Sequence, residues 1–185
     1  MSSPSIRELS GISACDLRQK LDMVTPPFDP FEVARRLGIE VSDTITWDKL
    51  EISGLITRKK KKVTIWVNPY DPEVRRRFTL AHELGHYVND ILVDGENEVS
   101  DTPETLYRNG SDDPKEVRAN NFAAELLMPT VIVLEKAFEL IKQAPSETMF
   151  AADLVAKLAV IFKVSKPAMT IRLKRLGLVK QNSPA

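Results

Sequence analysis

Residues 76–88 read Arg-Arg-Phe-Thr-Leu-Ala-His-Glu-Leu-Gly-His-Tyr-Val, and the rest of the sequence is best understood from this stretch. It holds both histidines of the chain, His82 and His86, four positions apart. On an α-helix, residues four apart lie one turn above each other, so the two imidazoles can reach one metal ion. Glu83 is rotated by roughly 100° from His82 and points to the flank of that ion, where it can act as a general base.

The pattern His-Glu-x-x-His is typical of zinc peptidases. The alternative interpretation is that two histidines share a helix face for packing alone. The neighbouring residues favour a buried helix, because an apolar arc runs along it: Phe78, Leu80, Ala81, Leu84, Gly85 and Val88. A glycine inside a helix costs about 1 kcal/mol relative to alanine, so Gly85 indicates that another backbone or a substrate passes close by.

A third metal ligand is required, because a tetrahedral catalytic zinc takes three protein ligands and keeps one position open. No further histidine exists and the lone Cys15 has no ligand pattern around it, which leaves a carboxylate. We expect it to be Glu116, which lies at the head of the core-facing stripe of a second amphipathic helix at 113–129. The alternative is a capping box between Asp113 and Glu116. Asn120, one turn later, would orient a ligand histidine through a hydrogen bond.

The segments before the histidine helix predict an α+β fold with a small three-stranded antiparallel sheet. Helices are expected at 6–24, ended by Pro26-Pro27, and at 30–37, closed by Gly38. Alternation predicts strands around 39–47, at 52–57 and at 63–67. The basic run 58–62 is interpreted as a solvated hairpin turn rather than a phosphate-binding patch. The last strand is either an ordinary core strand or the edge to which an extended substrate adds.

The turn 68–72 ends in Asp71-Pro72, which we expect to cap the histidine helix. Residues 94–113 are acidic and polar, and predict a loop that is either an active-site flap or an insertion. A further helix is expected over 130–143.

The C-terminal part, 146–185, is predicted to be a helix-turn-helix-like segment that follows a zincin-like domain over 1–145. After Asp153 it carries basic residues without an acid up to Lys180. Such a patch could bind DNA, but the expected reading helix lacks a base-reading side chain in its first turn, so we favour a structural or protein-recognition role.

The overall composition gives no electrostatic reason for binding nucleic acid or membranes, since 26 basic residues balance 26 acidic ones. No apolar run is long enough to span a membrane, and the N-terminus lacks a secretion signal. A single cysteine excludes an internal disulfide. We therefore expect a cytoplasmic protein without membrane contact.

Two blocks of sequence, 77–86 and 116–129, together resemble the ImmA/IrrE family of zinc metallopeptidases in order and spacing. The resemblance implies that His82, His86 and Glu116 bind Zn²⁺ and that Glu83 is the general base. It also implies a substrate, an Xre-type helix-turn-helix repressor. Family members often carry a further histidine after the metal helix, which is absent here. The oxyanion would then be stabilised by Tyr70, Tyr107, an arginine or a backbone amide.

The leading hypothesis is therefore a zinc endopeptidase that cuts such a repressor and relieves repression under stress, or in a mobile-element or toxin–antitoxin setting. Two other hypotheses remain: a module that sequesters a repressor or toxin without cutting it, and a DNA-binding regulator that uses the basic C-terminal segment.

Overall fold

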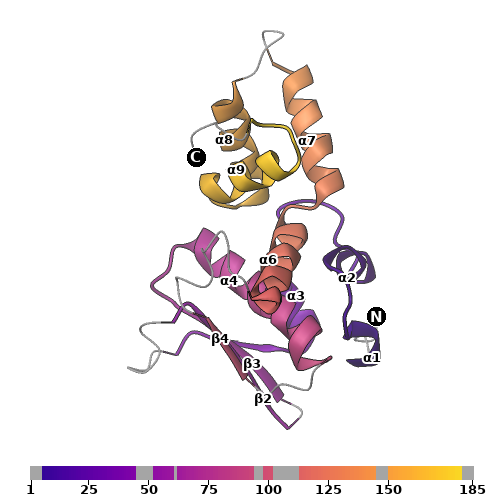
Figure 1. Ribbon diagram of the computed structural model, residues 1–185, viewed down its shortest axis with the longest axis vertical. Helices are drawn as coiled ribbons and strands as arrows, with labels where there is room; N and C mark the ends of the chain where they lie inside the picture. The colour runs from indigo at the N-terminus through magenta and orange to yellow at the C-terminus, as the bar shows by residue number, and fades with distance from the viewer. Residues whose placement is uncertain are drawn as a thin grey trace.

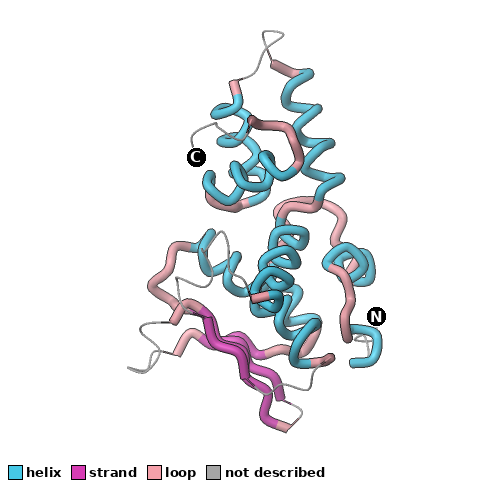
Figure 2. The backbone as a smooth tube through the Cα atoms, in the orientation of Figure 1, coloured by secondary structure: helices cyan, strands magenta, loops and turns pink. Residues whose placement is uncertain are grey.

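The computed structural model describes residues 6–44, 52–60, 62–93, 98–101, 113–144 and 150–180. Within these residues the fold is α+β, as predicted. A small sheet lies at one end of the molecule, helices α4 and α6 lie beside it, and helices α7 to α9 form the other end (Figure 1; Figure 2). One apolar core runs from the N-terminal helices to the C-terminal ones. No helix of the described part is long and apolar enough to cross a bilayer.

The N-terminal region forms two helices, α1 (Ile6–Leu9) and α2 (Ala14–Lys20), where the sequence predicted one over 6–24. The break follows from Gly11, which has a φ of +69° and donates its N–H to the carbonyl of Val88. Ser13 then caps α2 by accepting a hydrogen bond from the Asp16 N–H. The third helix, α3 (Pro30–Arg36), begins after the cap Asp29 and is followed by Gly38 with a φ of +70°, as expected.

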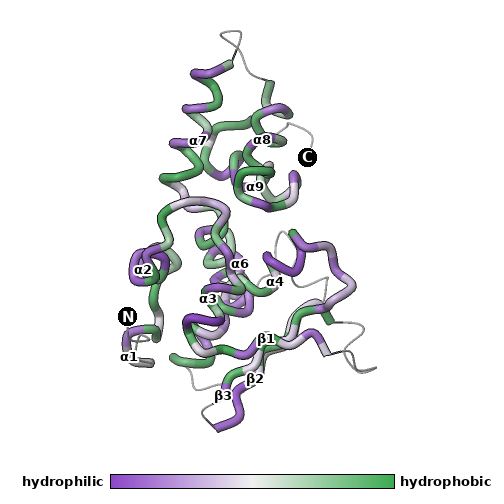
Figure 3. Tube along the Cα trace, turned by 180° about the vertical axis from the view of Figure 1, so that it is seen from behind, coloured by the Kyte–Doolittle hydropathy of each residue, from purple (hydrophilic) through white to green (hydrophobic). Residues whose placement is uncertain are grey.

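Within the described residues the sheet has four strands in the order β1-β3-β2-β4, so the prediction of three antiparallel strands is wrong. β1 (Glu40–Ser42) pairs parallel to β3 (Lys62–Val67), which makes the sheet mixed. β2 (Gly54–Lys59) and β3 form the expected hairpin, and its basic end is hydrophilic in Figure 3. β4 (Glu98–Asp101) pairs with β2 inside the stretch that was expected to be a loop. Residues 45–51, where the first strand was expected to continue, lie outside the described residues.

The strand before the histidine helix, β3, lies between β1 and β2 and is therefore an interior strand. Of the two interpretations left open for this strand, the structure supports the ordinary core strand, because both edges of β3 are already hydrogen-bonded within the chain. The edge strands of the described sheet are β1 and β4.

The histidine helix, α4, spans Glu73–His86 and packs closely against α6 (Pro114–Leu127). Pro72, rather than the expected Asp71, stands at the N-cap of α4 and supplies no side-chain hydrogen bond. Asp71 instead pairs with Arg75, with 3.2 Å between Oδ2 and Nε. After His86 the helix continues as the π-helix η2 (Tyr87–Ile91), marked by the hydrogen bond from the Leu92 N–H to the Tyr87 carbonyl.

The C-terminal part consists of α7 (Thr130–Lys142), α8 (Ala151–Phe162) and α9 (Lys166–Arg175). α8 and α9 form the predicted helix-turn-helix, with Lys163 in the left-handed region at the turn and Ser165 capping α9. The boundary predicted between residues 145 and 146 lies outside the described residues and stays a prediction.

Two arginines of the basic C-terminal patch are used inside the molecule. Arg172 donates to the Met128 carbonyl and pairs with Glu125, and Arg175 donates to Asn121. These contacts tie α9 to helix α6 and its C-terminal end. They support the structural role of this segment, since at least these two cations are committed to protein partners.

Candidate metal centre

Three side chains converge between α4 and α6: His82, His86 and Glu116. The two histidine Nε2 atoms lie 3.0 Å apart. Glu116 Oε2 lies 3.3 Å from His82 Nε2, and Glu116 Oε1 lies 3.2 Å from His86 Nε2. A tetrahedral zinc with bonds of about 2.0–2.1 Å separates its ligand atoms by roughly 3.3 Å, so these separations among the two rings and the carboxylate are close to those around such an ion.

Glu116 faces the histidines and not the start of its own helix. Asp113 caps α6 by accepting a hydrogen bond from the Lys115 N–H. The Glu116 carboxylate lies within 3.2–3.3 Å of the imidazoles, as the ligand hypothesis requires, and its role as a metal ligand stays a prediction.

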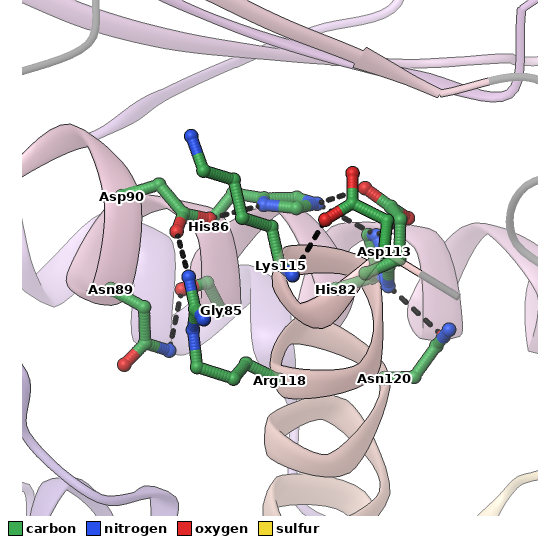
Figure 4. A network of polar contacts seen from close by, with 10 residues as sticks. His82, Gly85, His86, Asn89, Asp90, Asp113, Lys115, Arg118 and Asn120 are labelled. Carbon is green, nitrogen blue, oxygen red and sulfur yellow. Dashed lines mark hydrogen bonds and ion pairs between the residues drawn. The ribbon is translucent and has the colours of Figure 1, made fainter. Parts of the chain in front are cut away.

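The outer nitrogens of the two rings each face an oxygen acceptor (Figure 4). His86 Nδ1 lies 2.6 Å from Asp90 Oδ2, and His82 Nδ1 lies 3.1 Å from Asn120 Oδ1. A carboxylate can only accept, so the proton of a neutral His86 sits on Nδ1 and its Nε2 presents a lone pair. The same reasoning applies to His82 opposite the Asn120 oxygen.

The donor set therefore fits a cation. Two ring lone pairs and a carboxylate brought within 3.0–3.3 Å of one another repel unless a positive charge lies among them. In the absence of a cation, protons on the Nε2 atoms would take that place. Hydrogen bonds from His82, and next from His86, hold the pKa of the Glu116 carboxyl well below its usual value of 4.5, against the opposing effect of burial. The Glu116 carboxyl is thus ionised at neutral pH.

Asp90 is a residue of this site that the sequence reasoning missed. It is fully buried on η2, and its second oxygen lies 2.9 Å from Arg118 Nη2. This pair compensates the buried charge and orients the carboxylate toward His86. The signal was available, since Asp90 follows His86 by the same four positions that separate the two histidines.

Glu83 is fully buried, as are both histidines. Its carboxylate approaches Gly54 of β2 so closely that a Cβ at position 54 would overlap with Oε1. The close contact predicted for Gly85 is with the backbone of α6. A Cβ there would lie 3.0 Å from the Ala119 Cα and 3.2 Å from its carbonyl oxygen.

The candidates for the oxyanion donor stay predictions. Tyr70 lies in the turn before α4 and is 73% exposed. Tyr107 lies outside the described residues.

Within the described residues, two histidines of one helix and a glutamate of a second helix form a cluster that could hold a metal ion. The comparison of sequences specifies the class further: the chain belongs to the M78 peptidase family, whose IrrE N-terminal-like domain matches residues 34–174. The matched region contains all the residues of the centre.

A curated relative is the uncharacterized immunity region protein 2 of Bacillus phage phi105. It is 35% identical over 106 residues, which is 57% of this chain. The match spans 61% of the relative's own length.

Proposed function

We propose that this protein is a zinc-dependent endopeptidase of the cytoplasm that hydrolyses a peptide bond in an Xre-type helix-turn-helix repressor. Cleavage would relieve repression under stress, or in a mobile-element or toxin–antitoxin setting. The observation that carries the proposal is the convergence of His82, His86 and Glu116 at ligand spacing, with the buried carboxylate of Glu83 on the same helix.

The proposed roles follow from the chemistry of each group. His82, His86 and Glu116 would hold the zinc, and two histidines with one glutamate are a known ligand set of catalytic zinc. When bound, zinc polarises a carbonyl and lowers the pKa of water to about 7. Glu83 would accept the proton of the attacking water on its carboxylate and return it to the leaving nitrogen. Asn120 and Asp90 would keep the ring Nδ1 atoms protonated and the Nε2 atoms directed inward.

The repressor as substrate is supported by membership of the M78 family and by a relative whose name places it in a phage immunity region. DNA is the less favoured partner, because Arg172 and Arg175 have protein partners.

The test is incubation of the purified zinc-loaded protein with an Xre-type repressor encoded beside its gene, followed by mass spectrometry of the products. We expect two fragments from one cut, and no cut in the presence of a chelator. Glu83→Gln should retain zinc and leave the repressor intact, whereas His82→Ala should lose both zinc and cleavage. A stable stoichiometric complex with an uncut repressor would instead identify a sequestering module. Cleavage by Glu83→Gln at an undiminished rate would overturn the role of the general base.

A further inference from the structure

Gly54, the first residue of β2, lies against the carboxylate of Glu83. A Cβ built on Gly54 would lie 2.6 Å from the Thr79 Cγ2, closer still to Glu83 Oε1, and 3.1 Å from Glu83 Cδ. Thr79 and Glu83 are one turn apart on α4, and both are fully buried. The space beside the Gly54 Cα is therefore occupied by the side chain that we propose as the general base.

The backbone does not require a glycine here. Gly54 is part of a strand and its φ lies outside the left-handed region, unlike that of Gly11 or Gly38. Any residue could adopt this conformation. A glycine inside a strand weakens the strand and often marks a close approach of another group, and here that group is the carboxylate.

The strand cannot retreat to make room for a side chain. Gly54 is opposite Val67 of β3 on one side and Asp101 of β4 on the other, so β2 is held from both edges. The neighbouring Ser53 is also buried, at 1% exposure. Because packed interiors yield little, a methyl group at position 54 would move the Glu83 carboxylate and not the sheet.

A second glycine of the site has a different function. The neighbours of Gly85 are backbone and Cβ atoms of Ala119 and Phe122 on α6, which also carries Glu116. Gly85 thus sets the distance between the two helices that supply the metal ligands. Gly54 contacts no metal ligand among its nearest neighbours.

We propose that Gly54 is a positioning residue for Glu83, and that the absence of a side chain at this position fixes the carboxylate in its working place beside the metal ligands. The inference rests on the proposed peptidase function. According to this proposal, different contacts position the general base and the metal ligands. Strand β2 positions Glu83, and the contact between α4 and α6 positions the ligands.

The first experiment compares Gly54→Ala with Gly85→Ala in the zinc-loaded protein. For Gly54→Ala we expect one bound zinc, a KM for the repressor within about threefold of the original, and a kcat reduced about 100-fold, as misplacement of a reacting group by about 1 Å can produce. For Gly85→Ala we expect loss of zinc affinity. A kcat of Gly54→Ala within twofold of the original, or loss of zinc from this variant, would overturn the proposal.

The second experiment does not depend on activity. Urea unfolding of the zinc-loaded protein is measured for Gly54→Ala and Glu83→Ala, alone and together, all in a Thr79→Ser background that removes the contact with Thr79 Cγ2. We expect Gly54→Ala to lower the unfolding midpoint when Glu83 is present and to leave it nearly unchanged when Glu83 is alanine, which is a coupling between contacting residues.

The two experiments distinguish the proposed peptidase function from the proposed role of Gly54. Absence of repressor cleavage by the unmodified protein would refute the proposed function while the unfolding cycle still reports the contact. Equal midpoint shifts in both backgrounds would refute the contact and with it the role of Gly54.

Discussion

Asp90 Oδ2 lies 2.6 Å from His86 Nδ1, and both side chains are buried one turn apart where α4 passes into the π-helix η2. Such hydrogen bonds fix the tautomer and the orientation of a metal-binding imidazole and increase its basicity. Arg118 of α6 holds the other oxygen of Asp90. The contact between Arg118 and Asp90 thus joins α6 to the π-helix that continues α4, behind the three candidate metal ligands.

Asp90→Asn is therefore expected to weaken zinc binding. The amide keeps the shape of the side chain but loses the charge, and loss of such an outer partner lowers metal affinity by about 10–100-fold. Competition with a chromogenic chelator measures the effect. The matched control is Asp153→Asn, at an exposed position in the first turn of α8, which should leave the affinity unchanged. Equal affinities of the two variants would contradict the role of Asp90.

Glu116→Gln is expected to reduce zinc affinity more than Asp90→Asn does. The amide replaces an ionised oxygen ligand by a neutral one, and the pKa of Glu116 is lowered so that the carboxylate is charged at neutral pH. The loss of zinc affinity is measured as the zinc content per chain after dialysis against a weak chelator. Glu135→Gln, at an exposed position on α7, serves as the control. Retention of one zinc per chain by Glu116→Gln would remove this residue from the ligand set.

Removal of the metal should lower the melting temperature. Free zinc at about 100 times its Kd stabilises a folded protein by about 2.7 kcal/mol if the unfolded chain does not bind it. For a chain of this length that corresponds to roughly 5–10 °C. Thermal unfolding with zinc and with a chelator measures the difference, and His82→Ala should abolish it. A shift of equal size in His82→Ala would show that zinc acts elsewhere on the chain.

Arg172→Met is expected to destabilise the protein by about 1–3 kcal/mol, because it removes donors from Met128, Glu125 and Thr130 and leaves their partly buried acceptors unsatisfied. The methionine retains the apolar stem. Urea unfolding measures the loss. Lys157→Met, at an exposed position on α8, should change the stability by less than about 0.5 kcal/mol. Similar stabilities of both variants would mean that the basic segment is not anchored through Arg172.

The two ligand helices were predictable because their signals are local. The spacing of His82 and His86 defines one face of α4, and the apolar stripe headed by Glu116 defines one face of α6. The close contact at Gly85 was also anticipated, although the sequence did not decide between a backbone and a substrate as its neighbour.

The sheet was predicted less well because its pairing is not local. β4 is only four residues long and joins β2, some forty positions earlier in the chain, so no turn signal links them. β1 and β3 pair in parallel, and the sequence that connects them carries no signal that distinguishes parallel from antiparallel pairing. The division of the first helix at Gly11 likewise depends on a distant acceptor, the Val88 carbonyl.

The three candidate metal ligands come from two helices that are separate in the chain and meet at the contact between Gly85 and Ala119. In an unfolded chain Glu116 is not held beside the histidine pair, so we expect the full metal affinity only after the two helices have docked. Retention of the ion would therefore act as a check on assembly. A newly made chain would gain high-affinity metal binding only when α4 and α6 pack together. A damaged chain in which these helices separate would lose the metal before it unfolds completely.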